Sequence, residues 1–593
     1  MRHFIGYCAA GSEPVFGGTP APALFGPYQI LCRGFIANRA DLLAKAGRSQ
    51  TGNVPIADAE LFAIAYERWG TDLSRHVVGE FSLALFDAAE GRLLLAQDAL
   101  GLAPVFYSES SGRLAFASSL EDLVIETGTG QLDDEFIADY MARGEHFGEH
   151  TPYAHIRRLL PGESLVWRGG QRRLGTWTLA APDPVLYRDP RDYEERLRHL
   201  VKEAVQSALP PHGKVWCELS GGLDSSTILS VARRVLDREV EAVSFVYPQS
   251  YSVDEREWIE AVLKEHPAPW HPIDADAVRP FSELPTEFHA EPSRWVISAA
   301  MKRTYFQLLA AHGVDIVLSG EGGDAVLCGD EQFPFFLADL MLRGRWGRLW
   351  RHLPDWAEGI RGRRAMAYVL VKYALEPAIR HLRSWDLEYQ PATVRWAADD
   401  FAARADLKHR GRARRVPRSS TIGVAYMVQR IMRSAHVVRT CYHHHSSGFE
   451  FRHPLLYRPL IEFMLAVPWE TKIAPTHDRA LQRRAFKGIL PAKTLQRFNK
   501  GGGAQAMLEG LERSRAWHEA LTARPRIVER GYARLQEWRN AVQHARVGQT
   551  DGFPQFLASA ILELWLQGLE RLPAGKDSRS LSPGMTSPEQ RPG

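Results

Sequence analysis

The sequence lacks the features that mark secreted, membrane-spanning or disulfide-bonded proteins. Its 593 residues include five cysteines, at positions 8, 32, 217, 328 and 441, and no Cys-x-x-Cys pair. We therefore expect free thiols in a reducing compartment. No apolar run approaches the length of a membrane span, and the first residues are too short an apolar stretch for a signal peptide. These absences predict a cytoplasmic protein without a membrane partner.

The sequence also lacks a strong excess of charge. Its net charge is +3, with 45% hydrophobic, 24% charged and 10% aromatic residues, which is typical of a soluble globular protein. A charge this small does not indicate nucleic-acid binding, and we expect no nucleic-acid partner. There are no internal repeats. A chain of this length is expected to form two or more domains.

One stretch near residue 220 has the pattern of a phosphate-binding turn. Val215–Leu219 is expected to be a buried strand, and the helix after it carries Ile228, Leu229 and Val231. The turn between them holds glycines, hydroxyl side chains and one acid, namely Ser220, Gly221, Gly222, Asp224, Ser225 and Ser226. Glycines let backbone N–H groups close around a pyrophosphate, and a helix N-terminus favours its negative charge.

This turn differs from a Walker loop because no Gly-Lys-Ser/Thr sequence ends it. Asp224 stands inside the turn instead, where a carboxylate can hold Mg²⁺ against phosphates. We therefore predict the pyrophosphate-binding loop of an enzyme that cleaves ATP to AMP and pyrophosphate. The alternative is an ordinary strand-to-helix turn capped by Ser or Asp.

A second glycine-rich turn is expected at the same edge of the sheet. Strand patterns at Ala242–Tyr247 and Val314–Leu318 alternate with helical patterns, which predicts a parallel sheet. Such sheets bind ligands at the carboxyl ends of their strands. The segment Ser319-Gly-Glu-Gly-Gly-Asp324 directly follows the later strand, so its two acids open on the edge that carries the first turn.

The part of the chain before about Leu179 has a different pattern. Short β-rich runs such as Gln29–Ile36 and Glu80–Phe86 are separated by turns, and Asp58–Trp69 has a helical apolar face. Two layers of sheet with flanking helices would account for this pattern. The proline-rich stretch 181–190 is then a linker.

Residues 340–418 are distinguished by arginines interleaved with tryptophans, such as Arg345, Arg348 and Arg351 with Trp346 and Trp350. Mixtures of this kind can bind nucleic acid or a peptide. The alternative is a helical insertion with solvated basic faces. The tail 572–593 is rich in Pro, Ser, Gly and charge and is expected to be disordered.

Four motifs occur in an order that resembles one enzyme family. They are Ser220-Gly-Gly-Leu-Asp-Ser-Ser226, Leu318-Ser-Gly-Glu-Gly-Gly-Asp324, Glu450-Phe-Arg-His-Pro-Leu-Leu456 and Asn499-Lys-Gly-Gly502. This order closely resembles the synthetase domain of class B asparagine synthetases, whose relatives include β-lactam synthetases and lasso peptide cyclases. Phe81–Asp87 and Asp98–Tyr107 resemble that family's glutamine-hydrolysing domain. Apart from the Arg/Trp-rich insertion, the resemblance spans about 1–570.

The resemblance implies an α/β fold class with two domains. Residues 1–180 would form a glutaminase-like (Ntn-type) αββα sandwich, degenerate because it lacks the nucleophilic Cys. Residues 191–571 would form a parallel-sheet ATP pyrophosphatase domain, similar to the adenine nucleotide α-hydrolases, with the Arg/Trp-rich insertion inside it.

The resemblance also implies ATP and Mg²⁺ as cofactors. Asp224 and Asp324 would hold the metal between the phosphates. Lys500 would contact the α-phosphate and the negative charge that develops there. The adenosine part of ATP would contact four further residues, Leu219, Phe245, Ser319 and Gly320.

Two glutamates are candidates to receive the proton of the attacking amine or to orient that amine. Glu321 lies in the second glycine turn; β-lactam synthetases have Tyr at this position, which disfavours that branch. Glu450 is the other candidate, and its alternative role is a structural pairing with Arg452.

The N-terminal half departs from the family at its catalytic positions. The family's glutaminases carry a nucleophilic Cys after the initiator Met, whereas position 2 here is Arg. Cys8 falls inside an expected strand. The family's Asn-Gly-Glu clamp corresponds to Arg33-Gly34-Phe35, which lacks the carboxylate that binds the substrate's ammonium group, although Asp58 remains. We therefore predict a catalytically silent scaffold.

An intact synthetase half without an ammonia supply favours a substrate that brings its own amine. We predict a lasso peptide cyclase, which adenylates an Asp or Glu side chain of a precursor (core) peptide and joins it to the peptide's N-terminal amine. By resemblance, a leader-binding protein and a leader peptidase would be its partners. The alternatives are an ammonia-dependent asparagine synthetase, a small-molecule amide or β-lactam synthetase, and a pseudoenzyme, which the presence of Asp224, Asp324 and Lys500 disfavours.

Overall fold

The computed structural model describes most of the chain between residues 3 and 571. The described residues exclude 10–11, 18–20, 49–55, 169–170, 177–178, 180–181, 250–253, 330–334, 359–364, 384–393, 409, 411–420, 443–447, 476, 498–502 and 550–551. The predicted tail 572–593, most of the basic run after Arg410, and Lys500 therefore lie outside the described residues.

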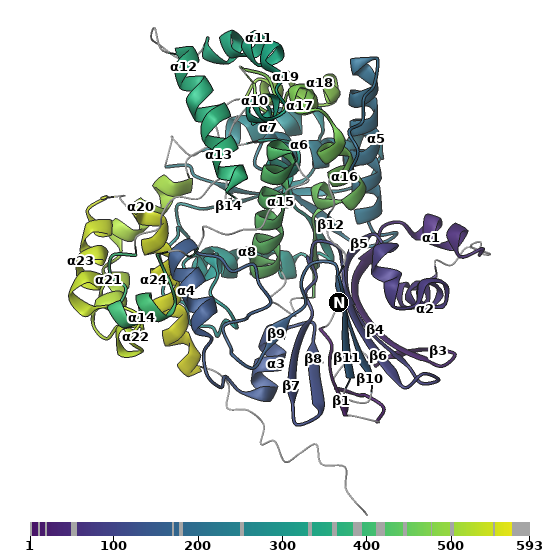
Figure 1. Ribbon diagram of the computed structural model, residues 1–593, viewed down its shortest axis with the longest axis vertical. Coiled ribbons are helices and arrows are strands. Elements are labelled where there is room, and N and C mark those ends of the chain that lie inside the picture. Colours follow the sequence, from purple (N-terminus) through teal and green to yellow (C-terminus); the bar gives the residue numbers. More distant parts are fainter. Residues whose placement is uncertain are drawn as a thin grey trace, which may run out of the picture.

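The N-terminal half consists of two antiparallel sheets, drawn in the lower part of Figure 1. The first sheet has the order β2-β1-β8-β7-β9, with β1 Ile5–Ala9, β2 Val15–Gly17, β7 Phe106–Ser110, β8 Arg113–Ala117 and β9 Arg157–Arg158. The second has the order β11-β10-β6-β5-β4-β3, with β3 Ala23–Phe25, β4 Tyr28–Ile36, β5 Gly79–Asp87, β6 Arg92–Gln97, β10 Glu163–Arg168 and β11 Gln171–Thr176.

Alternation along the strands builds a four-layer sandwich. Ala84 and Phe86 of β5 face the core between the two sheets, whereas Phe81, Leu83 and Leu85 face an outer core. That outer core is shared with α1 (Arg39–Lys45) and α2 (Asp58–Trp69), while α3 (Leu120–Thr127) and α4 (Asp134–Arg143) cover the first sheet. The predicted αββα arrangement is confirmed.

The C-terminal half contains a five-stranded sheet in the order β14-β13-β12-β15-β16, with every neighbouring pair parallel. Its strands are β12 Val215–Glu218, β13 Glu241–Val246, β14 Trp270–Asp274, β15 Ile316–Leu318 and β16 Glu450–Arg452. Helices α5 (Pro190–Ala208) and α6 (Leu223–Ser230) cover one face, and α8 (Ala299–Ala311) covers the other. The predicted parallel sheet is confirmed.

Both edge strands of this sheet escaped prediction from the sequence. Glu450–Arg452, which the sequence marked only as part of a motif, pairs with β15 as the short strand β16. Strand β14 is Trp-His-Pro-Ile-Asp, and its proline weakens the strand pattern. Edge strands need pairing on one side only, so short and irregular sequences are tolerated there.

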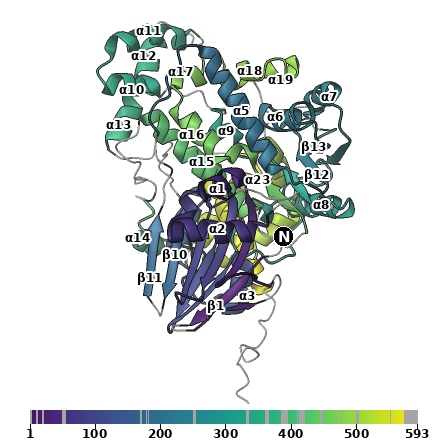
Figure 2. The same ribbon diagram turned by 90° about the vertical axis from the view of Figure 1, so that its right-hand side faces the viewer.

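The Arg/Trp-rich segment forms a group of helices beside the parallel-sheet domain. They are α10 (Phe336–Leu342), α11 (Trp346–Ala357), α12 (Ala365–Val369), the π-helical turn η4 (Leu370–Leu375), α13 (Glu376–Leu382) and α14 (Asp399–Arg404). Helices α11 and α12 lie at the end of the molecule opposite the sandwich (Figures 1 and 2). Asp339 anchors the group, because its carboxylate accepts hydrogen bonds from the backbone N–H groups of Ile422 and Gly423.

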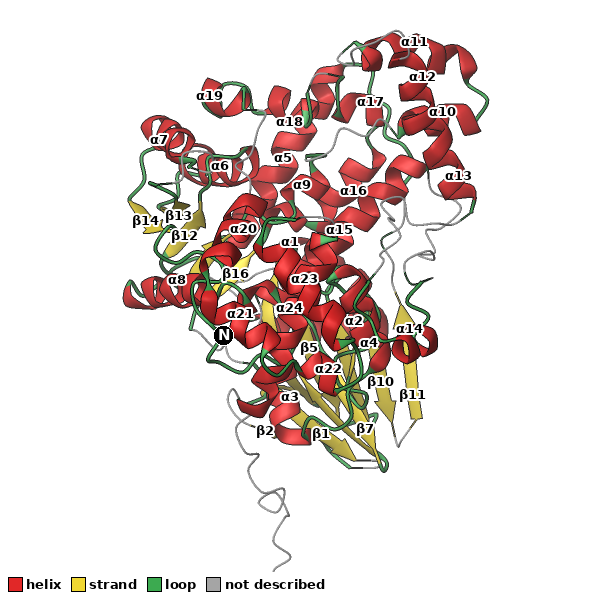
Figure 3. Ribbon diagram, turned by 90° about the vertical axis from the view of Figure 1, so that its left-hand side faces the viewer, coloured by secondary structure: helices red, strands yellow, loops and turns green. Residues whose placement is uncertain are grey.

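The sandwich packs directly on the C-terminal half. Helix α4 lies against α24 (Phe553–Gly568), and Figure 3 shows α20–α24 gathered over that side of the molecule. Arg158 donates to Glu291 at 2.8 Å in an ion pair that is 2% exposed on both sides. In the described part of the chain, no helix combines the length and apolar character needed to cross a membrane.

Candidate active site

The first glycine turn leaves the carboxyl end of β12 and enters α6. Gly221 has φ 67°, and a Cβ atom there would lie 2.5 Å from the Cβ of Trp258, so only glycine fits. The backbone N–H of Ser220 donates to Oγ of Ser225 at 3.1 Å, which folds the turn back on the first turn of α6. The sequence-predicted strand, turn and helix are all present.

The second glycine turn leaves β15, the neighbour of β12, and enters α9 (Gly323–Val326). The two turns touch. A Cβ at Gly323 would lie 2.3 Å from Cγ of Asp224, and a Cβ at Gly320 would lie 3.1 Å from the backbone nitrogen of Ser225. The glycines of the second turn therefore provide the space into which the acid of the first turn projects.

A pocket of about 410 Å³ opens where these two turns meet. It is lined by most of the sequence-predicted nucleotide and acid residues, namely Leu219, Ser220, Gly222, Asp224, Ser225, Phe245, Ser319, Gly320, Glu321 and Asp324. Gly221 and Ser226 do not line it, because Gly221 packs on Trp258 and Ser226 is fully buried on α6. A volume of this size is typical of pockets that hold ligands as large as a nucleotide.

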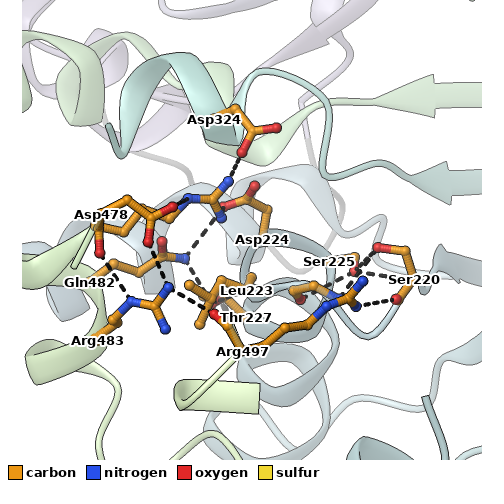
Figure 4. Close-up of polar contacts among 12 residues, drawn as sticks. Ser220, Leu223, Asp224, Ser225, Thr227, Asp324, Asp478, Gln482, Arg483 and Arg497 are labelled. Atoms are coloured by element: carbon orange, nitrogen blue, oxygen red, sulfur yellow. Dashed lines mark hydrogen bonds and ion pairs between the residues drawn. The ribbon is translucent and has the colours of Figure 1, made fainter. Parts of the chain in front are cut away.

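Asp224 and Asp324 converge on one position, where they share a cation supplied by the protein. The Nη1 atom of Arg479 lies 2.9 Å from Oδ1 of Asp224, and its Nη2 atom contacts Oδ1 of Asp324. Figure 4 shows Asp224 and Asp324 close together, with Gln482 and Asp478 nearby. Gln482 also reaches Oδ1 of Asp224 at 3.4 Å. Neither Arg479 nor Gln482 was singled out from the sequence, because 255 residues separate Arg479 from Asp224.

These two carboxylates fit Mg²⁺. They are oxygen ligands aimed at a point that already carries a positive charge, and Mg²⁺ is usually bound by one or two carboxylates together with phosphates and water. No cluster of three or more His, Cys, Asp or Glu side chains able to hold a metal occurs among the described residues. A metal at this position would therefore depend on oxygens from its nucleotide.

Arg497 fixes the segment that leads to Lys500 onto the first turn. Its Nη1 donates to the carbonyl oxygen of Ser220 at 3.1 Å, and its guanidinium pairs with Glu255 and stacks over Trp258 at 4.4 Å. Lys500 itself lies outside the described residues, so its assigned role stays a prediction. Arg497 nevertheless brings the chain three residues before Lys500 to the edge of the pocket.

The end of β12 adds a partly buried acid that sequence reasoning missed. Glu218 lines the pocket and accepts a hydrogen bond from the hydroxyl of Tyr305 at 3.0 Å. Burial raises the pKa of Glu218, and the hydrogen bonds from Ser319 and Tyr305 oppose that rise only in part. Its place at the carboxyl end of a parallel strand, close to the glycine turn, could have marked Glu218 as a site residue.

The two glutamates proposed as proton acceptors lie in different surroundings. Glu321 lines the pocket, and its backbone N–H donates to Oγ of Ser319 at 3.2 Å. Glu450 is absent from the described lining residues and accepts a hydrogen bond from Nε of Arg452 at 3.1 Å. The geometry therefore favours the structural alternative for Glu450.

The residues that correspond to the family's glutamine clamp lie near the synthetase half. The guanidinium of Arg452 lies over the ring of Phe35 at 4.3 Å. Arg33 is nearly buried, and burial lowers its pKa to about 10. Asp58 pairs with Arg39. This arrangement offers an arginine and an aromatic ring where binding of an amino-acid ammonium group would need a carboxylate.

The cysteines of the sandwich are poor candidates for a nucleophile. Cys8 is buried in β1, and burial raises its pKa to about 11. Cys32 lies in β4, and burial together with the charge of Asp58 raises its pKa to about 12. Because the thiolate is the reactive form, neither thiol is activated near neutral pH.

The fold and the pocket define a protein that joins an amidotransferase-type sandwich to a parallel sheet whose carboxyl edge forms a nucleotide-sized pocket. A model of the asparagine synthase family matches residues 196–567, and a glutamine amidotransferase domain model matches residues 17–178. The first match covers more than half of the chain, and the chain therefore belongs to the asparagine synthase family.

Individual relatives are distant. An amidase, chyE, of Penicillium rubens is 26% identical over 49% of this chain and 45% of its own length. Asparagine synthetase [glutamine-hydrolyzing] 3 of Bacillus subtilis is 22% identical over 79% of this chain and 74% of its own length. A putative asparagine synthetase [glutamine-hydrolyzing] of Mycobacterium tuberculosis is 28% identical over 60% and 56%. The chain thus spans about half to three quarters of the length of these relatives.

Among solved structures, the glutamine phosphoribosylpyrophosphate amidotransferase of B. subtilis aligns with 50% of this chain and 71% of its own. The identity is 12% and the TM-score is 0.21. A similarity this small says nothing about function.

Proposed function

We propose that this chain is an ATP-dependent ligase that closes a macrolactam, an isopeptide ring, in a peptide. A side-chain carboxylate oxygen of Asp or Glu attacks the α-phosphorus of ATP, and pyrophosphate leaves. The peptide's N-terminal amine then attacks the acyl carbon, and AMP leaves with the electrons of the C–O bond. The proton lost by the amine passes to a base. One amide bond forms for each ATP converted to AMP and pyrophosphate.

Each part of the pocket has a role in this reaction. The two glycine turns would hold the phosphates through backbone N–H groups and the hydroxyls of Ser220 and Ser225. Asp224 and Asp324 would hold Mg²⁺, which when bound neutralises charge on the pyrophosphate leaving group. Glu321 and Glu218 both line the pocket and are the acids positioned to accept the amine's proton.

The observation that carries the proposal is the contrast between the two halves. The sandwich offers two cysteines with raised pKa values and an aromatic ring in place of the clamp acid, so it is not equipped to release ammonia from glutamine. The parallel-sheet pocket keeps both acids and both glycine turns. A ligase without its own ammonia source needs free ammonia or a substrate that carries the amine, and the proposal takes the second.

A group of exposed apolar side chains in the Arg/Trp-rich insertion supports a peptide as that substrate. Of sixteen exposed large apolar side chains in the described part of the chain, nine lie between residues 342 and 382, and they are Leu342, Trp346, Trp350, Met366, Tyr368, Val371, Leu375, Ile379 and Leu382. We refer to these nine as the insertion face. It begins a short distance along the chain after Asp324, and aromatic side chains with nearby arginines are typical anchors for peptide partners. By the same proposal, a leader-binding protein and a leader peptidase would deliver the peptide.

The asparagine synthetases among the relatives favour a second candidate, an amide synthetase that uses free ammonia. The two candidates differ in their substrates. Pyrophosphate release from ATP is measured with a precursor peptide bearing a free N-terminus and an acid, with the same peptide N-acetylated, and with aspartate plus ammonium. The proposal predicts repeated turnover, with a product lighter by one water, for the first peptide only. The N-acetylated peptide can release at most about one pyrophosphate per protein, because its acyl-adenylate has no amine to accept it, and turnover with aspartate and ammonium supports the second candidate instead.

Variants of the insertion face test the peptide assignment. Trp350→Ala removes an indole that is 54% exposed, and Leu535→Ala removes an exposed side chain of the C-terminal helical region as a control. We expect the first change to raise the KM for peptide by roughly 10-fold or more, the scale of one interface anchor, with little effect on the KM for ATP. Equal peptide KM values in the two variants would exclude Trp350 as an anchor.

A further inference from the structure

Arg479 occupies a position that its surroundings are shaped to hold. The residue begins α18 (Ala480–Ala485) with φ 51°, a left-handed conformation that is unusual for a side chain of this size. Its side chain is 2% exposed. A Cβ at Gly329 would lie 2.3 Å from Nε and Nη2 of Arg479 and 2.5 Å from Oδ1 of Asp324. Glycine at 329 is therefore needed for the guanidinium to reach both acids.

The guanidinium and a metal ion would compete for the same carboxylate oxygens. Arg479 contacts the Oδ1 atoms of both Asp224 and Asp324. Mg²⁺ would bind carboxylate oxygens at roughly 2.0–2.1 Å and bring its own waters into the same space. Burial lowers the pKa of Arg479, but a guanidinium beside two acids keeps its proton. If a metal ion took these oxygens, the guanidinium would therefore need another negatively charged partner.

Two partners lie within reach of a displaced guanidinium: Asp478, 4.0 Å from Nε of Arg479, and phosphate groups bound in the pocket. Arg483, the next arginine on the same face of α18, already pairs with Asp478 at 2.6 Å. A pyrophosphate group held by the two glycine turns would lie beside Asp224, and an arginine fork matches phosphate oxygens well. The change from carboxylate to phosphate keeps a buried charge paired in both states, which avoids the cost of an unpaired buried ion.

We propose that Arg479 is a resident counter-ion for Asp224 and Asp324, which gives way to the divalent metal only when phosphate groups are present to receive it. This inference rests on the proposed function, since it takes these acids as the metal ligands. It predicts an order of binding: metal and phosphate enter together, and the metal alone is excluded. Arg479 is then a positioning residue in the empty site and a phosphate contact in the filled one.

Equilibrium dialysis with Mn²⁺, which measures the metal retained by the protein against protein-free samples with and without pyrophosphate, tests the order on the unaltered protein. We expect weak Mn²⁺ binding alone and binding tighter by at least tenfold when inorganic pyrophosphate is added. Equally tight Mn²⁺ binding without pyrophosphate overturns the inference and leaves the proposed function standing. No Mn²⁺ binding even with pyrophosphate overturns the metal assignment, and with it the proposed function.

Arg479→Gln provides the second test, and Arg484→Gln is its matched control. Arg484 lies on the same helix but pairs with Glu194, away from the pocket. In Arg479→Gln we expect Mn²⁺ alone to bind more tightly by roughly 10- to 100-fold, the equivalent of one hydrogen bond to a charged group, and pyrophosphate affinity to fall by a similar factor. Arg484→Gln should change neither. Unchanged Mn²⁺ and pyrophosphate binding in folded Arg479→Gln would make Arg479 a purely structural partner; if that variant does not fold, the titration of the unaltered protein decides.

Discussion

Glu80 is expected to be one of the residues through which the sandwich is held against the synthetase half. It lies at the start of β5, and its carboxylate accepts two hydrogen bonds from His453, from the backbone N–H at 2.6 Å and from ring Nδ1 at 3.1 Å. The side chains of His453 and Glu80 are 0% and 8% exposed. His453 directly follows β16, which pairs with the strand that feeds the second glycine turn.

The geometry sets the size of the effect. Removing one partner of a buried ion pair typically costs about 3–5 kcal/mol, because the other charge is left without compensation. Glu80→Gln keeps an oxygen that can accept from the backbone N–H of His453 and loses only the charge. We therefore expect Glu80→Ala to lie near the top of that range and Glu80→Gln to lie below it.

The pH dependence of unfolding distinguishes this ion pair from simple packing. Burial alone would lower the pKa of His453, but the charge and hydrogen bond of Glu80, with help from Glu218 and Glu321, outweigh burial and raise it. The pair's stabilisation is therefore complete below the ordinary histidine pKa of 6.5 and is lost as pH rises through the raised value. Glu80→Gln should flatten this part of the stability curve.

Urea unfolding followed by tryptophan fluorescence, from pH 6 to pH 9, measures both effects. The control is Glu67→Gln, whose partner Arg48 lies at 2.7 Å in a pair that is about half exposed; such pairs contribute roughly 0–1 kcal/mol. If Glu80→Ala cost no more than Glu67→Gln, or if Glu80→Gln kept the pH slope, the sandwich would not be held through this contact.

Four further predictions address the chemistry. Asp224→Asn and Asp324→Asn should each abolish AMP formation while the circular dichroism spectrum stays unchanged; near-normal AMP formation would remove that residue from the metal site. If Glu218 is the base, Glu218→Gln should remove the acid limb from the pH profile of kcat/KM. Burial raises the pKa of Glu218, so its active ionised form appears only at a pH above the ordinary glutamate pKa. A profile unchanged by the substitution leaves Glu321 as the base. Lys500→Ala should depress kcat by roughly 10²–10³-fold, the scale of one lost preorganised donor, with a smaller change in ATP affinity by calorimetry; lost binding with unchanged kcat makes it a binding residue. Glutamine should yield no glutamate, and measurable release would show that the sandwich is active.

Features with a local cause could be predicted from the sequence. The turn after β12 was visible because a strand, two glycines and a helix follow one another within sixteen residues, Val215–Ser230. Helix α2 has the predicted bounds, Asp58–Trp69, because its apolar spacing is regular. The parallel sheet followed from the alternation of strands and helices.

Features formed by distant parts of the chain could not be predicted in this way. Arg479 meets Asp224 across 255 residues, and Glu80 meets His453 across 373, so no local pattern marks either contact. Strand β16 has three residues and exists because β15 offers it a partner. For Glu450 the sequence left two roles open, and its carboxylate accepts a hydrogen bond from Arg452, which favours the structural one.

The fate of one oxygen atom tests the central claim most directly. A precursor peptide with oxygen-18 in the side-chain carboxylate of its acceptor Asp or Glu is incubated with the protein, ATP and Mg²⁺, and the products are weighed by mass spectrometry. If the carboxylate attacks the α-phosphorus, one labelled oxygen appears in AMP and the cyclised peptide is lighter by one labelled water. Label in inorganic phosphate, or unlabelled AMP beside an uncyclised peptide, would contradict the account.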